Sequence, residues 1–119
     1  MPLRLYTGTV ILLHMSTAWS ALADPHRRAV LEFLRERPRA VGEIVDRLPL
    51  TQPGTSKHLR VLREAGHVSV RREGQRRMYA LETAPMVELD AWLAPYRRLW
   101  SDRLDALERH LDQRAKEEE

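Results

Sequence analysis

The sequence predicts a mainly α-helical protein with one small β-hairpin, in the order four helices, hairpin and two further helices. Two observations lead to this prediction. Apolar residues recur at helical spacing before residue 66 and after residue 84, whereas residues 68–81 alternate around a Glu-Gly pair. The 119 residues suit one domain, and an apolar content of 43% is enough for a modest core.

The first helix is expected near residues 18–22, after an N-terminal extension of residues 1–14. A signal peptide is the alternative, because the apolar run Val10–Leu13 is followed by Ala-Leu-Ala at residues 21–23. Four apolar residues are too few for the hydrophobic region of a signal peptide. No apolar run approaches the roughly 20 residues that a helix needs to cross a bilayer. The chain also lacks cysteine, which fits a reducing compartment. We therefore expect a cytoplasmic protein without a membrane segment.

Capping residues place the second and third helices. Asp24 and Pro25 mark the start of the second helix, because aspartate caps helices and proline is tolerated in the first turn. Apolar residues within 30–34 give that helix a buried face. The third helix is expected over residues 41–48. Its start is weak, because Ala40 stands where a capping serine or threonine is usual.

The fourth helix, residues 51–65, has one apolar and one polar face. Thr51 caps it, Pro53 lies in its first turn and Gly66 ends it. The inward stripe consists of Thr55, Leu59 and Leu62. The opposite side carries small or charged residues, namely Pro53, Ser56, Lys57, Arg60 and Glu64.

Three histidines of this region are interpreted as structural. His58 lies beside the inward stripe of its helix, so we expect it to pack at the helix edge or to bond within the protein. His26 falls in a first helical turn and is expected at the surface. The residues around His67 indicate no partner.

A hairpin is expected over residues 68–81, with its turn at Glu73-Gly74. Its tip carries Arg71, Arg72, Arg76 and Arg77. One interpretation is that these charges do no more than keep the hairpin solvated. Their place next to a cationic helix favours contact with nucleic acid instead.

The C-terminal segment, residues 84–115, is expected to pack on another helix, because its apolar residues recur at steps of 4, 3, 4, 4, 3 and 4. They are Leu89, Leu93, Tyr96, Trp100, Leu104, Leu107 and Leu111, with Trp92 and Leu99 beside them. The aromatic members can line a ligand pocket, but core or dimer interface is the commoner role. Pro95 predicts two helices or one bent helix. Residues 116–119 are expected to be a disordered tail.

Positive charge is concentrated in the middle of the chain. Residues 1–50 carry 7 Arg or Lys and 5 Asp or Glu, residues 51–81 carry 7 and 2, and residues 82–119 carry 6 and 10. The local balances are therefore +2, +5 and −4. Eighteen of the twenty cations are arginine, whose planar guanidinium suits phosphates and guanine edges. The middle segment is thus expected to meet a polyanion.

Two short helices joined by a tight turn and followed by a basic hairpin form a winged helix-turn-helix. The DNA major groove admits one α-helix, whose first turns reach the base edges. The start QPGTSK is small and polar, as this approach requires, and the hairpin can place arginines on phosphates or in the minor groove. The sequence therefore predicts a regulator that binds double-stranded DNA. The alternatives are a non-specific architectural DNA binder and a protein-interaction module without a DNA role.

Three segments, ALADPHRRAVLEFL, AVGEIVDRLPLTQPGTSKHLRVLREAGHV and VRREGQRRMYAL, resemble the ArsR family of bacterial transcriptional repressors. The resemblance covers roughly residues 17–83. It implies a homodimer that binds an inverted repeat and represses its own operon. It also implies that an inducer or a partner protein releases the homodimer from DNA. It further implies a DNA-binding domain of residues 15–83 and dimerisation through the first helix and the C-terminal helices, residues 84–115.

The resemblance also assigns residues to both surfaces. It places DNA contacts on Gln52, Pro53, Ser56 and Lys57, a phosphate contact on Arg60, and wing contacts on Arg72, Arg76 and Arg77. The dimer interface is assigned to Trp19, Leu22, Leu89, Trp92, Leu93, Tyr96, Trp100, Leu104, Leu107 and Leu111.

The chain departs from the metal-binding members of that family. Where many members hold thiophilic metals through Cys-x-Cys, this chain has Ala-Val-Gly at residues 40–42. Where others hold zinc between the C-terminal helices, it has only His110, followed three residues later by Gln113. We therefore expect no metal and no cofactor. No catalytic set of nucleophile, base and acid is recognisable, so no enzymatic activity is expected.

Overall fold

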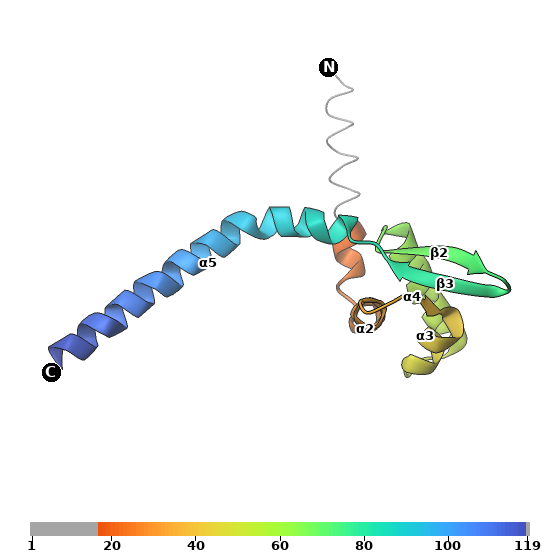
Figure 1. The fold of residues 1–119 in the computed structure, drawn as a ribbon, viewed down its shortest axis with the longest axis horizontal. Helices are drawn as coiled ribbons and strands as arrows, with labels where there is room; N and C mark the ends of the chain where they lie inside the picture. The colour runs from red at the N-terminus through yellow and green to blue at the C-terminus, as the bar shows by residue number, and fades with distance from the viewer. Residues whose placement is uncertain (1–16, 119) are drawn as a thin grey trace, which may run out of the picture. The chain divides into compact units, whose positions relative to one another are not determined.

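The computed structural model describes residues 17–118 and shows a mainly helical protein with one small sheet (Figure 1). A helical stretch at residues 17–21 precedes the elements α2, β1, α3, α4, β2, β3 and α5. The expected extension, residues 1–14, lies outside the described residues. The chain divides into two compact units, of which the first ends at Glu88 and the second begins at Leu89.

α2 runs from Pro25 to Leu34, as its capping sequence predicts. The Asp24 carboxylate accepts hydrogen bonds from the backbone N–H groups of His26, at 2.7 Å, and Arg27, at 3.3 Å. Desolvation raises the pKa of Asp24, but these two hydrogen bonds, together with the nearby His58 and Arg27, leave the pKa lowered. The cap is therefore ionised, which also suits the positive end of the helix dipole.

Two arginines of α2 secure the helical stretch at residues 17–21. Arg27 Nε donates to the carbonyl oxygen of Ala21 at 2.6 Å, and Arg28 Nη1 donates to that of Leu22 at 2.7 Å. The last carbonyls of a helix lack partners within it, so these cations satisfy groups that would otherwise need water. The first predicted helix is thereby fixed against α2.

α3 (Val41–Arg47) and α4 (Gln52–Glu64) form the helix-turn-helix. Ala40 offers α3 no side-chain cap, as expected from its methyl group. Instead, the Glu43 carboxylate accepts hydrogen bonds from Arg37 at 3.1 Å and from the N–H of Ala40 at 2.9 Å. Arg37 and then the Ala40 N–H lower the pKa of Glu43. The weak helix start is thus supported from its third residue.

A three-stranded antiparallel sheet, in the order β1-β3-β2, completes the first unit. β2 (Val68–Glu73) and β3 (Arg76–Leu81) form the predicted hairpin, with Gly74 at a φ of 62° in the turn. Glycine reaches this left-handed region without a steric cost. β1 (Arg39–Ala40) pairs with β3 and was not predicted, because two residues are too few to show an alternating pattern.

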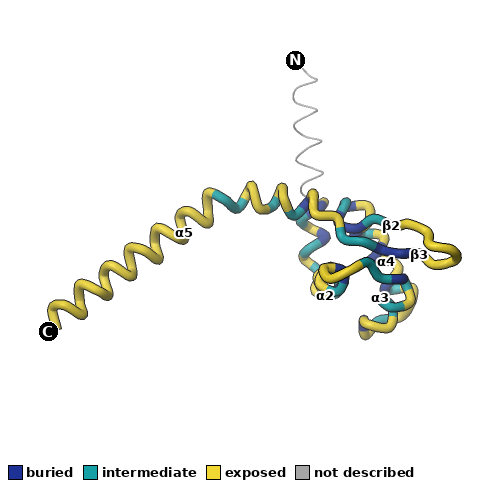
Figure 2. The backbone as a smooth tube through the Cα atoms, viewed as in Figure 1, coloured by how far each residue is buried: buried dark blue, intermediate teal, exposed yellow. Residues whose placement is uncertain are grey.

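The core lies among α2, α3, α4 and the sheet, where Figure 2 shows the buried segments gathered. Ile44 of α3 and Leu59 and Leu62 of α4 are its largest fully buried aliphatic side chains. Thr55 is also fully buried, so the predicted inward stripe of α4 is confirmed. The hairpin tip stays outside this core and is exposed.

α5 runs without interruption from Ala84 to Glu117, with Pro95 inside it. The alternative of two separate helices is therefore wrong. Proline removes one helical hydrogen bond and crowds the carbonyl four residues earlier, which can kink a helix without ending it. Here Arg97 donates to the Asp90 carboxylate, across the proline, and also lies 3.4 Å from the Asp90 carbonyl oxygen. This ion pair lowers the pKa of Asp90.

α5 also extends further than expected. Lys116 and Glu117, which we expected in a disordered tail, are helical. Both are good helix formers, and the cations of the last turn suit the negative end of the helix dipole. Among residues 17–118, no helix combines the length and the apolar content that crossing a membrane requires.

Candidate nucleic-acid interface

The start of α4 exposes small side chains on a firmly capped turn. Thr51 Oγ1 accepts a hydrogen bond from the N–H of Gly54 at 3.1 Å, and Pro53 occupies the first turn, where an N–H is not needed. A Cβ on Gly54 would lie 3.2 Å from the capping oxygen, so glycine allows the cap to close. The result is a narrow helix tip.

All five α4 residues assigned to DNA are exposed: Gln52, Pro53, Ser56, Lys57 and Arg60. They lie away from the core because the buried positions 55, 59 and 62 occupy the other side of the helix. Neither Lys57 nor Arg60 forms an ion pair with any described residue. Their charges therefore face solvent without a neutralising partner.

The hairpin divides its arginines between two faces. Cross-strand partners share a face of a sheet, and successive residues along a strand alternate. Arg72 and Arg77 are cross-strand partners on the face that also carries Tyr79, which belongs to the core. Arg71 and Arg76 lie on the other face. All four arginines are exposed, including the three assigned to DNA.

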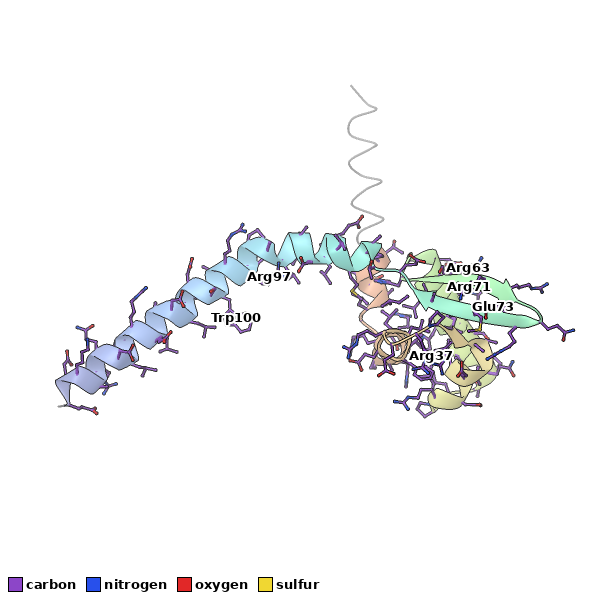
Figure 3. All side chains as sticks on the ribbon, in the orientation of Figure 1. Arg37, Arg63, Arg71, Glu73, Arg97 and Trp100 are labelled. Atoms are coloured by element: carbon purple, nitrogen blue, oxygen red, sulfur yellow. The ribbon has the colours of Figure 1, made fainter. Side chains whose placement is uncertain are left out.

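One of these arginines is neutralised within the hairpin. Arg71 Nη2 lies 3.2 Å from the Glu73 carboxylate, and Figure 3 labels this pair. Within residues 17–118, no ion pair engages Arg72, Arg76 or Arg77. The three arginines assigned to DNA thus keep their charge available.

A groove of about 500 Å³ lies between α4 and β3. We name it the cationic groove; its lining consists of Val41, Pro53, Ser56, Lys57, Leu59, Arg60, Arg63, Arg77 and Tyr79. Four lining residues are cations, and none of the described lining residues is acidic. Arg63 is the one of these four cations to which the sequence assigned no DNA contact. It follows Ser56 by seven residues on the same helix face, a spacing that signals its position.

The residues assigned to a dimer interface have different surroundings in the two units. On α5 in the second unit, six of them are exposed by 46% to 66%: Trp92, Tyr96, Trp100, Leu104, Leu107 and Leu111. Figure 3 labels Trp100, which is the most exposed of the six. Leu89 and Leu93 are half-buried. In the first unit, Trp19 is half-buried and Leu22 packs against the core.

None of the histidines that the structure describes lines the cationic groove. His67 is fully buried, and its Nε2 lies 2.7 Å from the Ala18 carbonyl oxygen, so this nitrogen carries the proton. The sequence around His67 indicates no partner, because that partner is 49 residues away in the chain. His58 sits at the helix edge as predicted, with its ring centroid 5.8 Å from that of His26, which is half-buried rather than fully at the surface.

The site offers cations and hydroxyl groups, not metal ligands. Within residues 17–118, no three His, Asp or Glu side chains lie close enough together to hold a metal ion. Ala40 to Gly42 form the start of α3, and His110 is exposed on α5.

A protein-family model described as a helix-turn-helix domain matches residues 22–71. The matched segment spans α2, α3 and α4 and reaches into β2. It therefore includes the exposed face of α4 and the first strand of the hairpin.

Related proteins match over similar regions. The HTH-type transcriptional regulator Rv2034 of Mycobacterium tuberculosis is 46% identical over 72 residues, 60% of this chain and 67% of that protein. The transcriptional repressor SdpR of Bacillus subtilis is 30% identical over 79 residues, 66% and 88% of the two chains. The uncharacterized HTH-type transcriptional regulator Rv0081 of M. tuberculosis is 39% identical over 95 residues, 76% and 81% of the two chains.

Solved structures share the fold. The crystal structure of the ArsR family transcriptional regulator RHA00566 matches with a TM-score of 0.67 and 34% identity, over 74% of this chain and 91% of that one. The solution structure of the homodimeric winged helix-turn-helix DNA-binding domain Mb0332 from Mycobacterium bovis matches with a TM-score of 0.63 and 26% identity, over 77% and 87%.

Proposed function

Because this chain belongs to the ArsR family of DNA-binding transcriptional regulators, and is a regulator rather than an enzyme, we propose that it acts as a homodimeric repressor on an inverted repeat. The observation that carries the proposal is the exposed face of α4, whose cations have no acidic partner among the described residues. In each protomer, α4 is the recognition helix in a major groove and the hairpin is the wing.

The residues of this surface have different roles in the proposal. Gln52 and Ser56 contact base edges, because the first turns of a recognition helix reach them and an amide suits adenine. Pro53 keeps the tip narrow enough for this approach. Lys57 and Arg60 contact phosphates. The wing contributes its unpaired arginines, Arg72, Arg76 and Arg77.

Two copies pair through α5 in this proposal. The stripe from Tyr96 to Leu111 leaves five large apolar side chains more than half exposed, and contiguous exposed apolar surface marks protein–protein contacts. A second copy offers the same stripe, as twofold pairing requires. The similarity to the homodimeric Mb0332 domain supports this assembly. The recognition helices then meet half-sites about one helical turn apart, about 34–36 Å.

The repressor controls the operon that contains its own gene, in the bacterial cytoplasm, and a small molecule or a partner protein releases it. The similarity to SdpR, which is named a transcriptional repressor, supports repression as the mode of action. An inverted repeat immediately upstream of the coding region is the expected operator.

A gel-shift and footprinting experiment on that upstream DNA tests the proposal. The wild-type protein should protect one inverted repeat, and its affinity should fall steeply with salt. Lys57→Ala and Arg60→Ala should each weaken binding, whereas Gln52→Ala should relax sequence choice. Uniform protection along the whole fragment would identify an architectural DNA binder instead. No binding by the wild type, even at low salt, would refute the proposal.

A further inference from the structure

The cationic groove lies where one strand of a bound duplex has to pass. The major and minor grooves of DNA are separated by the sugar-phosphate backbone. If α4 occupies a major groove and the hairpin reaches the adjacent minor groove, the backbone between them crosses the space between α4 and β3. We propose, on the basis of the proposed function, that the cationic groove holds this backbone and that Arg63 and Arg77 clamp a phosphate from opposite walls.

The α4 wall of the groove carries a row of cations. Lys57, Arg60 and Arg63 follow one another at intervals of three residues and all line the groove. With a rise of about 1.5 Å per residue, this row extends about 9 Å along the helix. Positive charge therefore continues from the recognition tip towards the C-terminal end of α4, where Arg63 lies.

The β3 wall supplies the opposing cation. Tyr79 is 7% exposed and belongs to the core, so it anchors this part of β3. Arg77 lies two residues earlier on the same strand face and lines the groove, while its cross-strand partner Arg72 shares that face. The apolar residues Val41 and Leu59 also line the groove. Less water in their vicinity strengthens the attraction between a phosphate and the surrounding cations.

Several arginines of the first unit are already engaged: Arg27 and Arg28 bind helix carbonyls, Arg37 and Arg39 bind Glu43 and Glu36, and Arg71 binds Glu73. The four groove cations, like Arg35, Arg72 and Arg76, have no such partner among the described residues. Within residues 17–118, Lys57, Arg60, Arg63 and Arg77 have neither an ion pair nor a side-chain hydrogen bond. Like charges that share a groove repel one another, and an inserted phosphate relieves that repulsion.

The two faces of the hairpin then have different roles. Arg77 faces the groove, whereas Arg71 lies on the other face and is held by Glu73. The clamp therefore predicts unequal effects for two arginines only six residues apart. A wing that contacts DNA merely through its total charge would make them equivalent.

The test measures affinity for a short labelled B-form duplex by fluorescence anisotropy, between about 50 and 200 mM salt. Arg63→Gln and Arg77→Gln remove one charge each and keep a long polar side chain. Each lost phosphate contact should lower the slope of log affinity against log salt by about 0.9, which is about 1.8 for a symmetric dimer. At about 0.1 M salt, this decrease in slope corresponds to an affinity about 60-fold lower than that of the wild type.

Two further variants serve as comparisons. Arg35→Gln removes an equal charge from the exposed C-cap of α2, outside the groove, and should leave the slope unchanged. Arg71→Gln should lower the slope by less than half as much as Arg77→Gln. Circular dichroism of all four variants should match the wild type, because the four side chains are exposed.

A modified duplex locates the clamp directly. Replacing single phosphates by neutral methylphosphonates should reveal one position in each half-site that weakens binding of the wild type more than binding of Arg63→Gln or Arg77→Gln. Wild-type slopes in both variants, or equal losses in Arg71→Gln and Arg77→Gln, would overturn the clamp while the proposed function stands. If the wild type itself shows no salt-dependent binding, the proposed function fails, and the clamp fails with it.

Discussion

The two compact units expose opposite kinds of surface. In the first unit, apolar side chains are enclosed among α2, α3, α4 and the sheet, and the exposed face of α4 is cationic. In the second unit, α5 leaves its apolar stripe in solvent. A cationic surface suits a polyanion, whereas an apolar stripe suits another protein surface. In the proposed function, DNA recognition therefore lies on the first unit, and most of the assigned pairing residues lie on the second.

Helical periodicity alone does not distinguish these two cases. The stripe of α4 and the stripe of α5 both recur at helical spacing. Leu59 and Leu62 of α4 are covered by elements of the same chain, whereas Leu104 and Leu107 of α5 are 51% and 52% exposed. Periodicity therefore predicts which face of a helix will be covered, but not whether the same chain covers it.

The largest expected effect compares one leucine from each unit. Leu62→Ala should lower the free energy of unfolding by about 2–5 kcal/mol, because Leu62 is fully buried and its loss leaves a cavity. Leu104→Ala removes the same atoms from an exposed site, so its cost should be smaller and should depend on protein concentration through pairing. Urea denaturation at two protein concentrations measures both. Equal, concentration-independent costs would contradict the contrast between the units.

A smaller effect is expected at the cap of α2. Asp24→Ala removes the acceptor of two backbone N–H groups and should destabilise the first unit by about 0.5–2 kcal/mol. Asp102→Ala, an exposed substitution in the middle of α5, should change stability by no more than about 0.5 kcal/mol. Thermal unfolding of the two variants gives the comparison. Indistinguishable midpoints would show that the cap does not stabilise the first unit.

The smallest expected effect is the pH dependence due to Glu43. Arg37 and the Ala40 N–H lower its pKa in the folded state. A lowered pKa contributes stability that is fully present above the unfolded value of about 4.3 and is lost as pH falls through the folded value. Glu43→Gln and Arg37→Gln should both flatten the decline of the urea midpoint below about pH 4.3. An unchanged pH profile in Glu43→Gln would exclude this contribution.

Much of the fold was predictable because its signals are local. Asp24 with Pro25, Thr51 with Pro53, and Glu73 with Gly74 each act on backbone within a few residues. Features defined by distant partners were not predictable. β1 is a strand only because it pairs with β3, and the bond between His67 and Ala18 spans 49 residues. The continuity of α5 through Pro95 was not predictable either, because a proline can kink a helix without ending it.

The candidate site was predictable to a similar extent. The exposure of Gln52, Ser56 and Lys57 follows from the helical repeat, which is set by the sequence. The cationic groove depends on how β3 lies against α4, so spacing along the chain does not show that Arg77 and Arg63 share it. The spacing of seven residues from Ser56 indicated that Arg63 faces outward. Nothing in the sequence indicated that β3 lies opposite Arg63.

The most direct test of the central claim, that the first unit binds DNA and the second pairs two copies, is the mass of the protein–duplex complex by multi-angle light scattering. The wild type should place two chains on one duplex. The double variant Leu104→Asp/Leu107→Asp should be monomeric and lose tight binding while keeping its helical content. Arg98→Asp changes the charge by the same amount, on the opposite side of α5, and should remain dimeric. One wild-type chain per duplex, or a double variant that still pairs and binds, would contradict the account.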